Sequence, residues 1–279
     1  MKRFAVPFAA CLCAAVTCAQ AQESITAASD VGFAPYSMQS MDGSFEGIDI
    51  DVAKGMSKYS GIDIKVIQQP WSTTFAGLAA GKFTAMWSAA AITPERAESM
   101  AFIEGYGEAI DSLLIRANGP DITKPDDLKG KTIAINKGSS ADKWLTEREK
   151  EFGITVARFE TSPDAVQAVL SGQADGYMMY QTAAGYASKK NPQLKVSSFV
   201  IRKGVPYGYA VRPDNIALRN KLDASLECMK ASGELDAIFV KWTGMQPMKG
   251  GITNTPQPGY GQPGTKYYED TPHDMKCSR

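Results

Sequence analysis

The chain has 279 residues, with 30 basic and 30 acidic side chains, a formal net charge of zero and a single histidine. This balance argues against nucleic acid or an anionic membrane surface as the partner, because both favour a strong basic excess. One histidine also leaves little material for a histidine-based metal centre or nucleophilic dyad.

The first 21 residues have the pattern of an export signal. Lys2 and Arg3 precede an apolar run over residues 4–16, and the small-residue pattern Ala19-Gln20-Ala21 follows it. We expect cleavage after Ala21, which removes both basic residues and leaves 28 basic and 30 acidic groups. The sequence therefore predicts an exported protein.

The five cysteines divide between this signal and the remaining chain. A lipoprotein signal with Cys18 at the new amino terminus is an alternative, although the residues before Cys18 match the required small-residue box poorly. Cys228 and Cys277 remain as an even pair and predict a disulfide in an oxidising compartment. It would close a loop of about 50 residues and stabilise the fold by about 4 kcal/mol in the chain-entropy model. Two free thiols are the alternative.

After the signal, short strand-like runs alternate with amphipathic stretches, which is typical of α/β architecture. About 258 residues exceed the usual size of one core, so we expect two lobes or one large domain. In chain order, the predicted strands are Ile25–Ser29, Ile62–Gln68, Phe83–Ser88, Ser112–Ile115, Thr132–Ile135, Thr155–Phe159, Ala174–Met178 and Tyr207–Val211. The predicted helices are Ile48–Tyr59, Thr73–Ala80, Ser140–Phe152, Pro163–Leu170, Thr182–Lys189, Ile216–Ala231 and Glu234–Trp242.

The last part of the chain changes character. In the helix predicted over 216–231, leucines recur every four residues and should form one buried stripe. Beyond Gly244, proline and glycine are dense between residues 250 and 264 and exclude regular structure. We expect residues 246–279 to form a tail on the surface, held at its far end by Cys277.

Several segments, taken in order, resemble periplasmic solute-binding proteins of ABC importers, in the class that takes polar amino acids. The ordered set of segments covers nearly all of residues 25–244. The segments are Asp30-Val31-Gly32-Phe33-Ala34-Pro35-Tyr36, Gly47-Ile48-Asp49-Ile50-Asp51-Val52-Ala53, Leu78 to Phe83, Ile92-Thr93-Pro94-Glu95-Arg96-Ala97, Asp127-Leu128-Lys129-Gly130-Lys131, Ala168 to Asp175, and Trp242-Thr243-Gly244.

The resemblance implies a two-lobed α/β periplasmic-binding-protein fold of type II. Each lobe would be a sheet flanked by helices, and the ligand would lie in the cleft between the lobes. The two crossovers would lie near Ser112–Ala117 and Val205–Arg212. Lobe one would then combine 23–112 with 208–245, and lobe two would span 113–207. Hinge closure would bury the ligand.

The resemblance also implies a carboxylate-binding arginine at Arg96, because a guanidinium can hold a carboxylate with two parallel hydrogen bonds. A surface arginine is the alternative. Ser139 and Ser140 follow Gly138 between a strand and a helix, where free backbone N–H groups could meet the same carboxylate. An ordinary helix cap explains these serines equally well.

Two aromatic residues and one acid complete the site that the resemblance implies. Phe33 and Trp71 match positions that sandwich the ligand side chain in relatives, and flat rings supply apolar contact at little entropic cost. Each could instead belong to the core. Asp30 follows the first predicted strand and is expected to touch a polar part of the ligand.

The departures from the family pattern bear on specificity. Where the family places an acid for the ligand's α-ammonium, this chain has Tyr180, which supplies no opposite charge. Two hydroxyl positions before the arginine are Ala89 and Ala91, while Ser88 remains. Either another acid substitutes, or the ligand lacks a free α-ammonium, which brings betaines, N-substituted amino acids and organic acids into consideration.

The sequence therefore predicts a non-enzymatic, periplasmic, monomeric binding component of an ABC importer, whose partners are a small carboxylate and the permease. It predicts no cofactor and no metal. One alternative is a sensing or accessory binding protein that works without a transporter, which the unusual tail suggests. A cleft enzyme is the less favoured alternative, because dehydratases of this fold have a carboxylic acid where Tyr180 stands.

Overall fold

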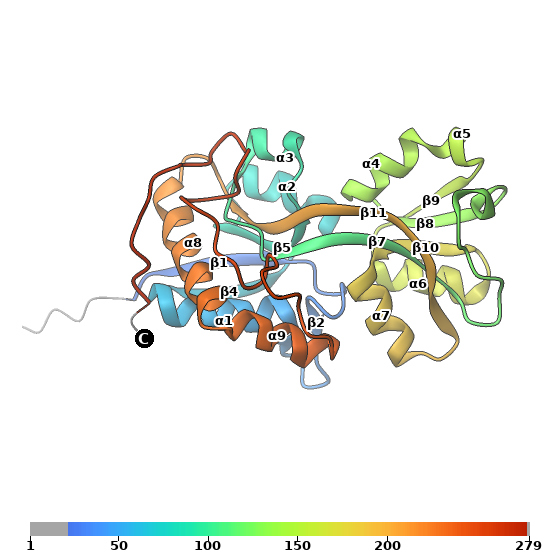
Figure 1. Cartoon of the computed structure of the whole chain (residues 1–279), viewed down its shortest axis with the longest axis horizontal. Helices are drawn as coiled ribbons and strands as arrows, with labels where there is room; N and C mark the ends of the chain where they lie inside the picture. The colour runs from blue at the N-terminus through green and yellow to red at the C-terminus, as the bar shows by residue number, and fades with distance from the viewer. Residues whose placement is uncertain (1–21, 278–279) are drawn as a thin grey trace, which may run out of the picture.

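The computed structural model describes residues 22–277, so the expected signal at 1–21 lies outside the described residues. The chain forms two α/β lobes joined by two long strands, β7 (Gly107–Arg116) and β11 (Leu194–Val211), which run from one lobe into the other (Figure 1). No helix within residues 22–277 is long and apolar enough to span a bilayer.

The first lobe is built on three parallel strands in the order β4-β1-β5. Every residue of β5 is buried, which fits a strand covered on both faces. The strands of this lobe are β1 (Ser24–Ser29), β2 (Met38–Gln39), β3 (Phe45–Glu46), β4 (Asp63–Gln68), β5 (Ala85–Ala91) and β6 (Ala101–Phe102). Its helices are α1 (Ile48–Ser60), α2 (Trp71–Ala79), α3 (Pro94–Ser99), α8 (Ile216–Ala231) and α9 (Glu234–Thr243).

The second lobe repeats this plan with the parallel order β10-β8-β9. Its strands are β8 (Thr132–Asn136), β9 (Thr155–Phe159) and β10 (Gly176–Tyr180). Its helices are the 3₁₀ helix η1 (Pro125–Leu128) and the α-helices α4 (Ser140–Glu147), α5 (Glu149–Phe152), α6 (Ser162–Ser171) and α7 (Gln181–Lys190).

The two long strands unite the lobes in one sheet. β11 pairs antiparallel with β5 at its first-lobe end, and β7 pairs antiparallel with β10 in the second lobe. Between these ends, β7 and β11 pair with each other, with three register shifts along the ladder. The polypeptide thus crosses between the lobes on two adjacent, hydrogen-bonded strands.

Most predicted elements are present, with shifted ends. The predicted helix 140–152 is two helices, because at Arg148 the chain leaves helical geometry (φ −111°) and its N–H bonds the carbonyl three residues back. The strands predicted at 112–115 and 207–211 are only parts of β7 and β11. The leucine stripe of α8 is buried, as expected, against the rest of the first lobe.

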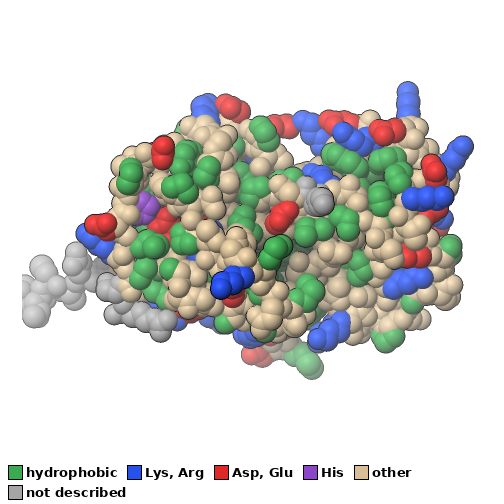
Figure 2. Space-filling view, viewed as in Figure 1, with side chains coloured by type: hydrophobic (Ala, Val, Ile, Leu, Met, Phe, Trp, Pro, Cys, Tyr) green, Lys and Arg blue, Asp and Glu red, His purple; other side chains and the backbone are tan. Residues whose placement is uncertain are grey.

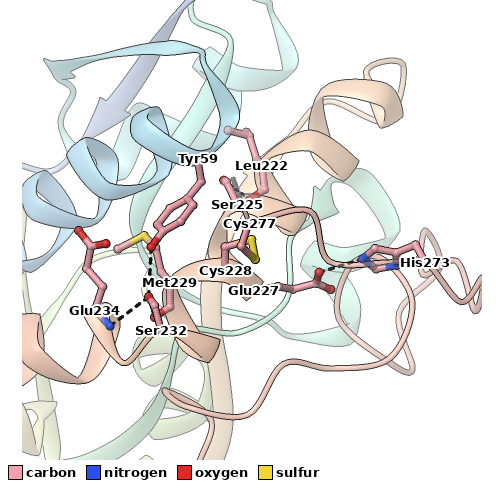
Figure 3. The surroundings of a disulfide bond; sticks show 10 residues. All are labelled: Tyr59, Leu222, Ser225, Glu227, Cys228, Met229, Ser232, Glu234, His273 and Cys277. Carbon is pink, nitrogen blue, oxygen red and sulfur yellow. Dashed lines mark hydrogen bonds and ion pairs between the residues drawn. A yellow bond between two sulfur atoms is a disulfide. The ribbon is translucent and has the colours of Figure 1, made fainter. Parts of the chain in front are cut away.

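The predicted disulfide is confirmed: Cys228 on α8 is bonded to Cys277 at the end of the tail (Figure 3). Nearby, the imidazole of His273 lies 2.8 Å from the carboxylate of Glu227. Residues 246–277 contain no helix and follow the first lobe along α8 (Figure 1).

The tail covers a group of buried charges that we call the α8 cluster, made of Glu104, Arg219, Asp223, Glu227 and Lys230. Backbone N–H groups of tail residues Gln257 and Gly261 donate to Glu104 and Asp223, and the carbonyl of Tyr267 accepts from Arg219. The ammonium of Lys230 lies 2.8 Å from the Glu104 carboxylate. The tail is therefore part of the folded first lobe.

Candidate functional site

A narrow cavity of about 60 Å³ lies between the lobes, beside β5, β10 and the start of α4. Eight of the nine predicted ligand-binding residues line it: Asp30, Phe33, Trp71, Ala89, Arg96, Ser139, Ser140 and Tyr180. Ala91 is not part of the lining, but its carbonyl accepts a hydrogen bond from Arg96 at 3.0 Å. The structure thus brings the predicted residues together, while their contact with a ligand stays a prediction.

Arg96 is positioned by α3, which begins at Pro94 and is capped by the Thr93 hydroxyl. Its guanidinium donates to the carbonyls of Ala91 at 3.0 Å and of Gly138 in the other lobe at 3.2 Å. It also lies over the Trp71 ring, 5.2 Å from the ring centroid. Among residues 22–277 no carboxylate comes within 4.0 Å of it, and burial lowers its pKa to about 10. Arg96 is therefore a largely desolvated cation without an anionic partner.

The start of α4 faces this cation from the second lobe. Gly138 adopts a left-handed conformation (φ +74°) that turns the chain from β8 into the helix. The Ser139 hydroxyl caps the helix by accepting from the Asp142 N–H, and the Ser140 hydroxyl accepts from Arg202 at 2.9 Å. Ser139 is thus a helix cap as well as a lining residue, and the first-turn N–H groups remain suited to an anion.

Aromatic rings form much of the remaining wall. Phe33 stacks on Tyr36, and Trp71 is 8% exposed with an indole N–H that bonds no described residue. A continuous series of ring contacts leads from this wall into the first lobe. The contacting pairs in order are Tyr180–Tyr207, Tyr207–Tyr106, Tyr106–Tyr209 and Tyr209–Trp87, with centroid distances of 5.4, 4.9, 4.4 and 4.1 Å.

Tyr180 ends β10 and reaches across to the first lobe. Its hydroxyl donates to the carbonyl of Ala89 at 3.0 Å, and burial raises its pKa far above the usual value. The phenol is therefore neutral and already engaged. The alanines at 89 and 91 contribute backbone carbonyls, one to Tyr180 and one to Arg96, in place of side-chain hydroxyls.

Two first-lobe acids on the cavity wall have raised pKa values because they are desolvated. The pKa of Asp30 rises to about 6, although the N–H of Trp71 bonds its carboxylate. The pKa of Asp49 rises to about 7, although the hydroxyls of Tyr106 and Tyr209 bond it. Both carboxylates are thus poised to hold a proton or to meet a cation near neutral pH.

A third acid, Asp111 on β7, also lines the cavity and was not predicted from sequence. It is fully buried, and its Oδ2 lies 2.6 Å from Nε of Arg202 on β11. Burial raises its pKa, and the charge of Arg202 opposes that rise. The signal that could have revealed it is an acid two positions before the apolar run of residues 113–115.

Outside the narrow cavity, a wider groove of about 1160 Å³ runs between the lobes and shares Arg96 as part of its wall. Its other charges are mostly paired, for example Lys143 with Glu95 across the lobes. On the face seen in Figure 2, basic and acidic side chains are interspersed, without a field of one sign. Among the described residues, no cluster of three or more His, Cys, Asp or Glu side chains could hold a metal ion.

Known proteins resemble this chain over the two lobes. It is 34% identical over 212 residues to the ABC transporter glutamine-binding protein GlnH of Bacillus subtilis, covering 74% of this chain and 75% of the relative. It is 28% identical over 228 residues to ABC transporter arginine-binding protein 1 of Escherichia coli, covering 80% and 92%.

Solved structures agree in fold. An ancestral arginine-binding protein bound to glutamine matches with a TM-score of 0.75 and 28% identity, covering 81% of this chain and all of that one. An ancestral amino acid-binding protein described as a precursor of cyclohexadienyl dehydratase matches at 0.71 and 28% identity, covering 79% and 95%. The model of bacterial extracellular solute-binding proteins, family 3, matches residues 25–245, and the chain belongs to this family.

Proposed function

We propose that this protein is the extracytoplasmic substrate-binding component of an ABC importer and that it captures an amino acid or a related small carboxylate. The observation that carries the proposal is Arg96, which is desolvated in the interlobe cavity with no carboxylate partner among residues 22–277. An anion in the cavity would remove that electrostatic cost, and the planar guanidinium suits a carboxylate.

Ligand capture would work by closure of the lobes about β7 and β11. In our proposal lobe one comprises 23–112 and 208–245, and lobe two comprises 113–207. Arg96 and Tyr180 already bridge the lobes through the carbonyls of Gly138 and Ala89. A ligand that contacts both lobes adds to these bridges and favours the closed form by the amount of its extra affinity for that form.

The residues of the cavity support a zwitterionic or polar ligand. Arg96 and the start of α4 would take the carboxylate, Phe33 and Trp71 would flank the side chain, and Asp30 would face a polar group. Relatives named for glutamine, arginine, histidine and cystine support an amino acid as the ligand class. Export by the signal at 1–21 would place the protein in the periplasm as a monomer beside its permease.

One observation supports a second candidate, a cleft enzyme: the match to a precursor of cyclohexadienyl dehydratase. Against it, Tyr180 provides a neutral phenol that is committed to the Ala89 carbonyl. We therefore propose binding without catalysis. Turnover of a bound acid by purified protein, followed by mass spectrometry, would favour the enzyme instead.

A thermal-shift screen tests the proposed function. The panel should contain the standard L-amino acids, betaines and small carboxylates, since a ligand of the native state raises the melting temperature. We expect at least one carboxylate to raise it, and the shift to disappear in Arg96→Ala. If no compound shifts the wild type, or if the shift survives in Arg96→Ala, the proposed site is wrong.

A further inference from the structure

Asp111 stands in the middle of a row of three facing residues in the sheet. On one side it is opposite Tyr180 of β10, and on the other side it is opposite Arg202 of β11. Residues directly opposite each other in adjacent strands project to the same face and have Cβ atoms about 5 Å apart. Asp111 is thus the acid next to Tyr180, the position where the family pattern expects an acid.

The two carboxylate oxygens of Asp111 differ in their surroundings. Oδ2 is bonded to Nε of Arg202 at 2.6 Å, and the same guanidinium donates to the Ser140 hydroxyl at the start of α4. Oδ1 is buried and bonds no donor among the described residues. A buried carboxylate oxygen without a donor costs about 1–3 kcal/mol or more, so a donor at this atom would be strongly favoured.

We infer that Asp111 replaces the missing acid and that its Oδ1 accepts an N–H from the α-ammonium of the bound ligand. The inference rests on the proposed function and sharpens it. Arg202 holds the Asp111 side chain in place and supports its ionised form. Because Arg202 also bonds Ser140, the acceptor is coupled to the helix start expected to meet the ligand carboxylate.

If Asp111 accepts this hydrogen bond, the protein should prefer ligands whose ammonium carries a hydrogen over betaines and deaminated acids. Tyr180 by itself does not distinguish these ligand classes. A primary or secondary ammonium can donate a hydrogen bond to Oδ1, whereas a quaternary betaine nitrogen carries no hydrogen and a deaminated acid carries no nitrogen. Asp49 is the competing acceptor, since its Oδ2 also bonds no described residue. No cation within residues 22–277 pairs with Asp49, however, and its raised pKa of about 7 leaves it partly protonated at neutral pH.

The test compares three probes by titration calorimetry: the tightest-binding standard L-amino acid, its α-deaminated acid and its N,N,N-trimethyl betaine. Wild-type protein should prefer the amino acid by about 10- to 100-fold, the range for a hydrogen bond to a charged group. In Asp111→Asn the amino acid should lose about that factor, while the two analogues change little. Arg202→Gln keeps both Asp111 oxygens but removes the cation that supports the ionised carboxylate, so the preference should fall in this variant too.

Other outcomes are distinguishable. Equal weakening of all three probes in Asp111→Asn would show a purely structural role and overturn the inference. So would loss of the preference in Asp49→Asn but not in Asp111→Asn, or a wild type that binds a betaine or deaminated acid but no amino acid. If the wild type binds none of the probes, or if Arg96→Ala binds them all normally, the proposed function fails first.

Discussion

The α8 cluster and the interlobe cavity both bury charged groups, but they differ in how those charges are paired. Under the tail, Lys230 meets Glu104, Arg219 lies near Glu269, and Glu227 meets His273. In the cavity, the Arg96 guanidinium meets backbone carbonyls and rings but no carboxylate among residues 22–277. Asp111 is paired with Arg202 through Oδ2, and its Oδ1, like Oε1 of Glu104 in the α8 cluster, bonds no described donor. A buried charge that is paired within the chain has its desolvation cost offset by its partner. A buried charge without such a partner favours binding of an oppositely charged ligand.

The largest expected effect is on stability, at Lys230. Lys230→Met leaves Glu104 buried without its cation, and we expect a loss of about 3–5 kcal/mol in the free energy of unfolding, measured by chemical denaturation. Lys54→Met is the matched control, because the Lys54 side chain is 72% exposed. Adding Glu104→Leu to Lys230→Met should recover much of the loss. If Lys230→Met is as stable as the wild type, the charge pairs of the α8 cluster do not stabilise the fold, and the two regions do not differ in this respect.

Arg96→Ala should lower ligand affinity by at least about tenfold, since a buried charged contact of about 2–5 kcal/mol is removed. Stability without ligand should hold or rise, because a desolvated, unpaired cation is deleted. Titration calorimetry measures the first effect and denaturation the second. Arg212→Ala is the control, since Arg212 lines the wide groove but not the narrow cavity. If Arg96→Ala binds the ligand with wild-type affinity, Arg96 is not the charge that holds the ligand in the cavity.

Cys277→Ala should destabilise the protein by about 2–4 kcal/mol, because a loop closed across 49 positions becomes free in the unfolded chain. Ligand affinity should not change, since the disulfide joins α8 to the tail away from the cavity lining. The double variant Cys228→Ala/Cys277→Ala should behave like the single one. A clear fall in affinity would show that the tail and the cavity are coupled.

The smallest effect concerns pH. Burial alone would lower the pKa of His273, but its hydrogen bond and ion pair with Glu227 outweigh this and raise the pKa above 6.5. The stabilisation is complete below about pH 6.5 and is lost as the pH rises through the folded-state value. Burial also raises the pKa of Glu227, so this residue likewise makes the free energy of unfolding fall as the pH rises. Because His273 also lowers the pKa of Glu227, the difference between wild type and His273→Gln reports the pair of residues together.

The single histidine makes this measurement direct, because one NMR titration reports His273 alone. The stability of His273→Gln should fall less steeply over the same pH range. A folded-state pKa at or below 6.5 would contradict the assigned ion pair.

Much of the fold could be predicted from local sequence patterns. The alternation of strands and helices, the leucine stripe of α8 and the Cys228–Cys277 pair each follow from residues close together or from a count of two cysteines. The length of β7 and β11 did not follow from the sequence. The unpredicted start of β7 contains the acids Glu108 and Asp111, and the β7–β11 ladder has three register shifts, so neither segment shows a clean apolar alternation.

The cavity residues that match the family pattern were predicted from the sequence. Asp111 was missed, because its place in the cavity depends on pairing between strands that are distant in sequence. Asp111 and Arg202 are 91 positions apart, and only strand register brings them together. The buried charges of α8 were equally hidden, since a charged helix face reads as solvent-exposed until a tail is placed over it.

The series of rings from Tyr180 to Trp87 also has an optical consequence. Neighbouring centroids lie 4.1–5.4 Å apart, so light absorbed by a tyrosine on the cavity wall can pass along the series to an indole deep in the first lobe. A ligand in the cavity would lie against Trp71, whose indole lines the cavity wall and is 8% exposed. We therefore expect ligand binding to change the intrinsic tryptophan fluorescence, which can be followed without any added dye.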